Sequence, residues 1–401
     1  MINNIEKNLK KIFNAIEDIA LYNFNKVLDA YKNNRVSTQH FSPTTGYGYD
    51  DLGRDMLCKL IADIFSSEKA IFSPLITSGT HALYIALSGI LKPNDNFLCL
   101  GKPYDTLNDV IFGENNNSLQ DFGINCRILE SDSNNNFNFN LIKKELNKNK
   151  PKLILITRSS GYSWREALKI NEIGHLIDYI KTNQKDAIVL VDNCYGEFVS
   201  KKEPTEVGAD IVVGSFIKNI GGGIAPTGAY IVGKAKLIDK IANRFIAPSI
   251  GMEIGSYNAS YTPFYQGLFL APTIVKNAVK SSLIFGYAFK QLGYETLPKI
   301  SSNNLPGDII RAIKFESKDK LIKFVQEIQK NSPIDSFATP EPWGMPGYSN
   351  EIIMASGSFT QGSSIELSAD APIKSPYIAY LQGSLTYEHS VIALNTILKK
   401  F

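Results

Sequence analysis

Between about residues 56 and 286, short apolar runs alternate with longer segments in which apolar residues recur at helical spacing. Strands that are apolar at nearly every position are typical of a parallel sheet whose two faces are both covered by helices. The sequence therefore predicts an α/β fold with a mainly parallel sheet. The apolar runs are DNFLCLGKPYD, INCRILES, PKLILITR, AIVLVDNC, ADIVVGSF and TGAYIVG.

Two further regions flank this α/β pattern. Apolar residues recur at helical spacing from Ile5 to Tyr31 and predict a long helix, and a stretch rich in glycine and polar residues then follows as far as Asp55. From residue 287 the sequence pattern changes and predicts short strands and two helices, the last over about residues 387–399. We expect three parts: an N-terminal helix and arm (1–55), a large domain (56–286) and a small α+β domain (287–401).

Composition excludes several classes of partner. Of the 401 residues 20% are charged, and the net charge of +3 gives no reason to expect nucleic acid or an anionic membrane surface. We identify no apolar run of the roughly 20 residues that a membrane span needs. The four cysteines lack CxxC spacing, which favours reduced thiols and a soluble, cytoplasmic protein. We expect no metal site.

The chemistry is concentrated in two segments, VLVDNCYGEF and GADIVVGSFIKNIGGG. The first strand ends at Asp192, and the second ends at Gly214-Ser215 with Lys218 three residues further on. A carboxylate that holds a protonated ring nitrogen and a lysine that forms a Schiff base are what pyridoxal phosphate (PLP) requires. A surface lysine and a strand-end cap are the ordinary alternatives, but a lysine between an apolar strand and three glycines favours the cofactor.

Other residues complete the predicted cofactor site. Ser78, Gly79 and Thr80 precede a helix whose first N–H groups and partial positive charge suit a phosphate, although serine and threonine are also common helix caps. Ser215 offers one more hydroxyl, and Tyr104 follows a strand and is able to stack on a flat ring. Because ligands of parallel sheets bind at the carboxyl ends of the strands, we expect these side chains to converge.

At this point the chain resembles a known family: the fold-type I PLP-dependent enzymes of the methionine gamma-lyase or aluminium-resistance group, which are relatives of cystathionine lyases. The resemblance extends over nearly the whole chain. It is carried by HFSPTTGYGYDDLGRD, SGTHALYIAL, GKPYDTL, SSGYSWR, VDNCYGEF, GSFIKNIGGGIAPTGAYIVG, FYQGLFLAP, PWGMPGYSNEIIMASGSFTQGSSIELSADAP and YLQGSLTYEH.

The resemblance implies a large domain with a seven-stranded sheet, a lysine–cofactor link at Lys218 and a pairing of Asp192 with the pyridine nitrogen. In related lyases an N-terminal arm reaches the phosphate site of the neighbouring subunit, and Tyr47, Tyr49 and Arg54 match that arm. The resemblance thus implies a homodimer as the catalytic unit, paired again into a homotetramer.

Three positions depart from the family pattern. The block expected as RSRGY reads RSSGY over residues 158–162, Lys374 stands where arginine is more usual, and Ile220 replaces a common proline. Lysine lacks the bidentate fork that arginine offers to a carboxylate. We predict Arg158, Arg165 and Lys374 as the substrate-binding residues, since each could hold a substrate carboxylate.

We expect a PLP-dependent carbon–sulfur lyase that acts on a small sulfur-containing amino acid by beta- or gamma-elimination. Lys218, its pKa lowered by desolvation, would act as general base, and Tyr104 or Lys218 would protonate the leaving group. An aminotransferase of the same fold, or a PLP-binding protein without turnover, remains the alternative, because one scaffold hosts many reactions.

Overall fold

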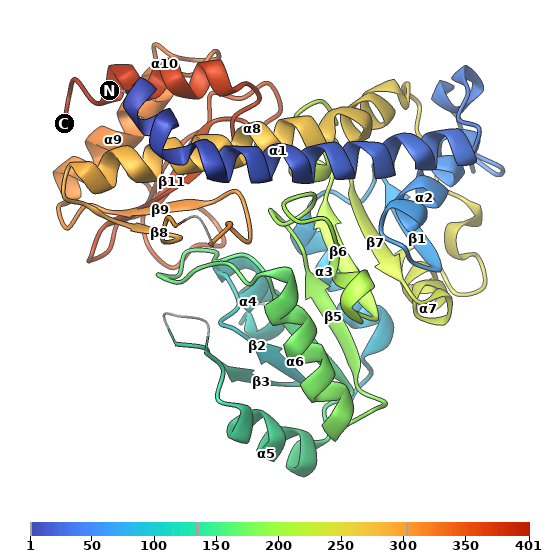
Figure 1. Cartoon of the computed structure of the whole chain (residues 1–401). Coiled ribbons are helices and arrows are strands. Elements are labelled where there is room, and N and C mark those ends of the chain that lie inside the picture. Colours follow the sequence, from blue (N-terminus) through green and yellow to red (C-terminus); the bar gives the residue numbers. More distant parts are fainter. Residues whose placement is uncertain (1, 115, 133–135, 302–303) are drawn as a thin grey trace.

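The computed structural model describes residues 2–114, 116–132, 136–301 and 304–401. Its larger sheet has seven strands in the order β1-β7-β6-β5-β4-β2-β3, and only β7 runs against the others (Figure 1). The strands are β1 (Lys69–Ser73), β2 (Asn96–Leu100), β3 (Asn125–Leu129), β4 (Leu153–Thr157), β5 (Ile188–Asp192), β6 (Ile211–Ser215) and β7 (Ala229–Gly233).

Helices cover both faces of this sheet because its central strands are apolar on both sides. In β4, Leu153 and Leu155 pack into one core cluster while Ile154 and Ile156 pack into the other. Successive strand residues point to opposite faces, so both faces need a cover. The covering helices are α2 (Leu52–Ile64), α3 (Gly79–Ile90), α4 (Asp105–Phe112), α5 (Phe139–Asn149), α6 (Ile170–Asn183) and α7 (Ala235–Phe245).

The smaller sheet is antiparallel throughout, in the order β10-β11-β12-β9-β8. Helices α9 and α10 lie with it at the C-terminal end of the molecule (Figure 1). Its elements are β8 (Glu295–Leu297), β9 (Arg311–Lys314), α9 (Lys318–Lys330), β10 (Ile352–Ala355), β11 (Ser368–Pro372), β12 (Ile378–Gln382) and α10 (Tyr387–Ile397). The chain also contains the short 3-10 helices η1 (Thr38–Phe41), η2 (Pro204–Val207), η3 (Asn219–Gly221) and η4 (Gly251–Glu253).

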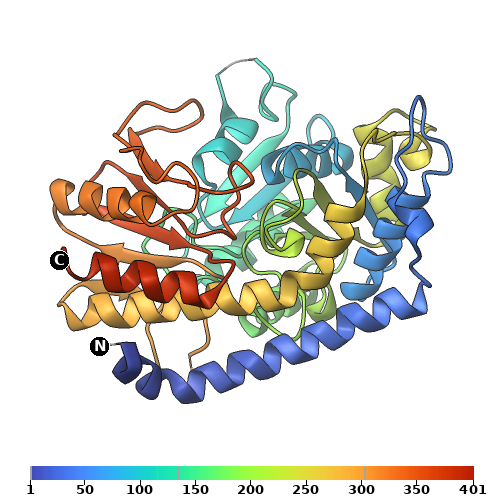
Figure 2. The same ribbon diagram turned by 90° about the horizontal axis from the view of Figure 1, so that it is seen from above.

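Two long helices extend along both parts of the molecule. Helix α1 (Ile2–Asn33) and helix α8 (Thr262–Gln291) run side by side along the whole molecule, as both ribbon views show (Figures 1 and 2). Helix α8 is long and apolar enough to cross a membrane by length and composition, but 61% of its most apolar window is buried inside the protein. Its apolar character is therefore that of a core helix.

The architecture confirms the predicted fold class of a mainly parallel, helix-covered sheet with a smaller α+β unit. Strand β1 was not predicted: KAIFS begins with an exposed lysine and joins the sheet through β7, which lies far along the chain. The segment SSIELSAD (363–370) predicts a strand of the small unit, but its first five residues lie mostly in turns and bends, and β11 begins at Ser368. The expected domain boundary at residue 286 falls inside α8.

Candidate active site

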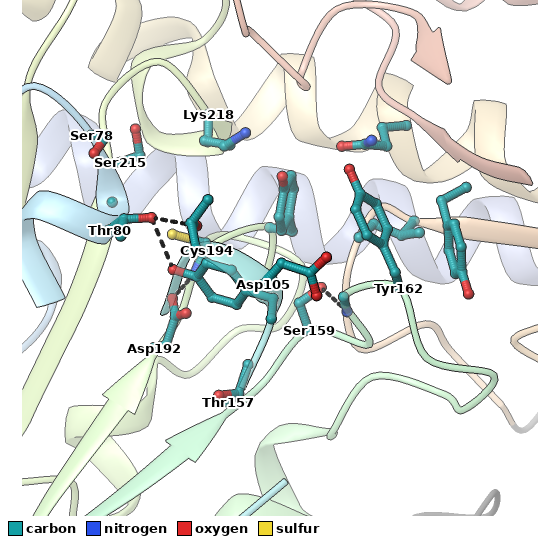
Figure 3. Close-up of a pocket in the computed structure, with 18 of the residues that line it drawn as sticks. Ser78, Thr80, Asp105, Thr157, Ser159, Tyr162, Asp192, Cys194, Ser215 and Lys218 are labelled. Atoms are coloured by element: carbon teal, nitrogen blue, oxygen red, sulfur yellow. Dashed lines mark hydrogen bonds between the residues drawn. The ribbon is translucent and has the colours of Figure 1, made fainter. Parts of the chain in front are cut away.

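A cavity of about 240 Å³ lies where the carboxyl ends of the parallel strands face the smaller sheet (Figure 3). It collects side chains from both parts of the molecule, as expected for an open α/β sheet. The lining residues are Ser78, Gly79, Thr80, Tyr104, Asp105, Thr106, Thr157, Ser159, Gly161, Tyr162, Asp192, Cys194, Tyr195, Ser215, Ile217, Lys218, Ile310, Tyr348, Tyr380 and Gln382.

One end of the cavity is suited to an anion. Helix α3 begins at Gly79, and the Ser78 hydroxyl accepts the His81 N–H at 3.0 Å as a helix cap. The Ser215 hydroxyl is buried beside it and has no hydrogen-bond partner among the described residues. A Cβ added to Gly79 would lie 3.1 Å from Cys194 Sγ and 3.6 Å from Ser215 Cβ. Free N–H groups of the helix terminus, an unpartnered hydroxyl and a close backbone approach together form a phosphate cradle.

Asp192 lies at the end of β5, beneath this cradle (Figure 3). It is 3% exposed, and its carboxylate accepts the Cys194 N–H at 3.1 Å. Burial raises the pKa of Asp192 to about 6, against the lowering effect of that N–H and of Lys218. A buried carboxylate with so little compensation favours a cationic ligand.

Lys218 points into the same cavity from the loop after β6 (Figure 3). Its Nζ donates to Ser364 Oγ at 2.8 Å and to Gly362 O at 3.4 Å, and lies 4.7 Å from the centre of the Tyr195 ring. Burial alone would lower the pKa of Lys218, but Tyr195, Cys194 and Asp370 outweigh it and the net shift is upward. The sequence suggested a lowered pKa for Lys218, but in the chain without a bound cofactor this pKa is raised.

Tyr104 also lines the cavity. It precedes α4, and its hydroxyl lies 3.4 Å from Thr80 Oγ1. Burial, together with the nearby Asp192, raises the pKa of Tyr104 well above its usual value. The phenol therefore keeps its proton near neutral pH and is a donor in this site.

Tyr195 was missed by sequence reasoning, although it belongs to the VDNCYGEF segment. Its φ of 73° and that of Phe198, 61°, lie in the left-handed region that non-glycine residues rarely adopt. Two such residues in one short turn are costly, and costs of this kind persist where surrounding contacts enforce them. The turn holds the Tyr195 ring against the Lys218 ammonium, and a positive φ cannot be read from a sequence.

The predicted carboxylate ligands do not line the cavity. Arg158 is fully buried behind the Asp192 turn, where it donates to Asn193 Oδ1 at 2.7 Å and lies 3.9 Å from Glu203. Arg165 donates to backbone carbonyls, among them Thr157 O at 3.2 Å. Lys374 is exposed on the turn between β11 and β12. Two of the three predicted groups are thus engaged in hydrogen bonds within the chain and the third faces solvent, so the binding of a substrate carboxylate by these residues stays a prediction.

The predicted arm residues also lie outside the cavity of their own chain. Tyr47 and Tyr49 are 71% and 62% exposed, with ring centres 5.8 Å apart. Arg54 is buried instead and donates to Gly48 O and Gly255 O, both at 3.2 Å, and to Asp55 at 2.8 Å. Arg54 therefore fixes the base of the arm, while the two tyrosines project from it.

The remaining cavity wall comes from the smaller sheet and the loops beside it. Tyr162 lies on the side of the cavity away from Ser78 and Thr80 (Figure 3). Its hydroxyl donates to Asp370 at 3.1 Å, and Gln382 Nε2 donates to the same carboxylate oxygen at 2.7 Å. Sequence reasoning missed Asp370, Gln382, Tyr162 and Tyr348, since only the fold brings these distant segments together.

The observed groups fit PLP. The Ser215 hydroxyl and the α3 terminus suit the phosphate, and Tyr104 offers a ring face. Buried Asp192 makes no ion pair with a described residue, and Lys218 reaches the same cavity. The mostly parallel seven-stranded sheet is that of the fold-type I PLP-dependent enzymes, and these residues stand where a cofactor of that kind would fit.

Comparisons with known proteins agree with this class. The PLP-dependent protein YhfS of Escherichia coli is 16% identical, with a TM-score of 0.64 over 96% of this chain and 97% of its own. A Campylobacter jejuni protein that is provisionally named an O-acetylhomoserine (thiol)-lyase and carries a pyridoxyl-lysine is 13% identical, with a TM-score of 0.60 over 89% of this chain and 88% of its own. At such identities the likeness shows the fold alone.

The chain belongs to the methionine gamma-lyase family, whose family model matches residues 1–401. It is 45% identical to a carbon-sulfur lyase involved in aluminum resistance from Clostridium novyi, with a TM-score of 0.94 over 99% of this chain and 94% of that one. The provisionally named cystathionine beta-lyase of Clostridium acetobutylicum is 44% identical, with a TM-score of 0.95 over 100% and 94%. Protein YnbB of Bacillus subtilis, which has no described function, is 45% identical over 96% and 92%.

Proposed function

We propose that the chain is a PLP-dependent carbon–sulfur lyase acting on a sulfur-containing amino acid. The observation that carries the proposal is the convergence of Lys218, Asp192 and the phosphate cradle on one cavity. The solved relatives of high identity named as carbon-sulfur or cystathionine lyases support the reaction class.

In this proposal Ser78, Gly79, Thr80 and Ser215 hold the phosphate, Asp192 holds the ring nitrogen and Tyr104 covers one ring face. When bound, PLP supplies an electron sink for negative charge at the alpha carbon of the substrate. The charge on Asp192 keeps that sink effective, because an anion beside the nitrogen favours its protonated form.

Proton transfers fall to two side chains of the chain. Lys218 takes the proton from the alpha carbon, with the Tyr195 ring and Ser364 Oγ positioning its amine. Tyr104, whose raised pKa keeps the phenol protonated, or Lys218 then donates a proton to the leaving sulfur. The cavity walls hold both groups close to the same substrate atoms.

The test compares Lys218→Ala with Lys185→Ala, an exposed lysine in the turn after α6. We expect Lys218→Ala to lose both visible cofactor absorbance and turnover, and Lys185→Ala to keep both. The substrate panel is L-cystathionine, L-methionine, L-cysteine and L-homocysteine, assayed for keto acid and thiol release. Amine transfer to keto acids with a silent panel would favour an aminotransferase, and turnover by Lys218→Ala would overturn the proposal.

We also propose a homodimer as the catalytic unit, with Tyr47 and Tyr49 of each chain reaching the partner's phosphate site. Their exposure on a projecting arm supports this arrangement. Light scattering of the purified protein tests the mass. Ala at both positions should weaken cofactor retention, whereas Tyr22→Ala, which removes an exposed tyrosine of α1, should not. A monomer with full activity would contradict the proposal.

A further inference from the structure

A short loop before β10 supplies part of the cavity wall. Trp343 and Ile352 exchange two backbone hydrogen bonds, at 3.1 Å from the Trp343 N–H and 3.0 Å from the Ile352 N–H. This pairing ties together the two ends of residues 344–351, which we call the lid loop. Tyr348, in the middle of the lid loop, is one of the residues that line the cavity. The loop is thus fixed at its base and carries a tyrosine into the site.

The tip of the lid loop is held by one carboxylate of the large domain. Asp105, the first residue of α4, accepts the Ser349 backbone N–H and the Ser349 hydroxyl, both at 3.0 Å and both through Oδ2. Beside this contact Gly347 has a φ of 82°, and a Cβ added to it would lie 2.9 Å from Thr106 Cγ2. The lid loop therefore rests directly on the first turn of α4, immediately after Tyr104.

The strength of these contacts allows the lid loop to open. Ser349 is exposed and Asp105 is half-buried, so water is able to replace both hydrogen bonds when they break. A hydrogen bond of this kind changes an equilibrium by a factor of about 3 to 10. Two such bonds favour the observed position without locking the loop there.

The position of Tyr348 gives the contact its consequence for the site. Its ring centre lies 6.2 Å from that of Tyr162, which lines the cavity on the side away from Ser78 and Thr80 (Figure 3). Burial in this position raises the pKa of the Tyr348 hydroxyl. In the proposed function the cofactor phosphate occupies the cradle end, so the two tyrosine rings face the space that is left for the substrate.

We propose that Asp105 is a positioning residue: by holding Ser349 it keeps the Tyr348 ring in place as a wall against which the substrate binds. The inference rests on the proposed function, because it takes the substrate to occupy the space beside the cofactor. Asp105 takes no part in the proton transfers, which fall to Lys218 and Tyr104. The lid loop therefore acts on the affinity for substrate and leaves the chemical steps unchanged.

Hydrogen exchange read by mass spectrometry tests the contact without any substrate. In protein purified with PLP, Asp105→Ala removes both hydrogen bonds, and the protection of the amides in residues 344–351 should fall about 10-fold or more. Ser349→Ala removes one bond and should lower protection by about 3- to 10-fold, but should have no further effect once Asp105 is Ala. The control Asp109→Ala, which removes an exposed carboxylate one turn further along α4, should keep wild-type protection. Unchanged protection in Asp105→Ala would overturn the proposal.

Steady-state kinetics with the best substrate of the panel above tests the consequence. The wall contacts the substrate before and during the reaction alike, so Asp105→Ala should raise KM by about 3- to 10-fold and leave kcat within about twofold. Asp105→Asn keeps an acceptor for Ser349 and should restore most of the wild-type KM. A fall in kcat with loss of visible cofactor absorbance in Asp105→Ala would mean that Asp105 supports the folded site as a whole, and would refute the assignment.

A double-variant comparison shows whether Asp105 acts through the tyrosine. Tyr348→Ala should raise KM by a similar factor, and adding Asp105→Ala should raise it no further. Effects that multiply would contradict the proposal.

Calorimetry with L-cystathionine and L-methionine separates failure of this inference from failure of the proposed function. If either compound binds without turnover and its dissociation constant rises about 3- to 10-fold in Asp105→Ala, the positioning role stands and the lyase proposal falls. If turnover occurs and KM is the same in wild type and Asp105→Ala, the lyase stands and the positioning role falls.

Discussion

Replacing Arg158 by Met tests whether this residue supports the active site from behind or binds substrate. The guanidinium donates to Asn193 and faces Glu203, with both charged side chains fully buried. Asn193 directly follows Asp192, the carboxylate proposed to hold the cofactor, and the Arg158 backbone N–H donates to Asp192 O at 3.1 Å. Loss of the guanidinium should therefore loosen the turn that positions the site.

The size of the effect follows from the geometry of the buried pair. Arg158 Nη1 and Glu203 Oε2 are 3.9 Å apart, and at an effective dielectric constant of about 20 their attraction is worth about 4 kcal/mol. Removing one partner of a buried pair typically costs about 3–5 kcal/mol, because the remaining charge has no compensation. Since burial raises the pKa of Glu203, protonation should relieve part of this cost as the pH falls.

Urea unfolding of four proteins gives the assay: wild type, Arg158→Met, Glu203→Gln and the double variant. In the double variant the Asn193 amide is free to turn and accept from the new amide at position 203, so we expect a coupling energy of about 2 kcal/mol or more. Steady-state kinetics runs alongside. An Arg158→Met protein of wild-type stability whose KM for substrate rises strongly at constant kcat would refute this reasoning and restore Arg158 as a carboxylate ligand.

Three further predictions concern the cofactor site. In the apoprotein the pKa of Asp192 is raised from 3.8 to about 6, so the folded state binds a proton that the unfolded state has lost. This group therefore lowers the free energy of unfolding by up to about 3 kcal/mol as the pH rises from about 4 to 6. Asp192→Asn should remove that pH dependence. Gly79→Ala should weaken PLP binding because its Cβ would fill the cradle, whereas Gly174→Ala, with its nearest neighbour at 3.4 Å, should bind PLP normally; equal affinities would contradict the cradle. Ser215→Ala should raise the PLP dissociation constant by about tenfold, measured by equilibrium titration, and an unchanged constant would remove Ser215 from the phosphate site.

The fold was predictable where a strand is buried on both faces. LILIT and IVVGS begin with apolar runs, are buried at every position and are both central strands. Strand β1 was missed because KAIFS becomes a strand by pairing with β7, which lies about 160 residues further along the chain. Local pattern carries no information about such a contact.

The candidate site, too, was predictable only in part. Asp192, Ser215 and Lys218 were predictable because each follows a strand whose end the sequence marks. Arg158 follows such a strand too, yet its side chain turns inward, and a Cβ on Gly196 would lie 2.5 Å from that guanidinium. Sequence spacing gives the strand end but not the direction of the side chain. Asp370 and Gln382 were missed because their role depends on how the two sheets face each other.

The paired helices α1 and α8 restrict how the cavity opens. Helix α8 begins beside the large sheet and continues beneath the small one as a single 30-residue element, with α1 alongside it (Figure 2). Hinged opening of the two sheets would have to bend this rod and break its packing. We therefore expect small molecules to enter and leave by movement of the loops that line the cavity, such as the segment before β10 that carries Tyr348.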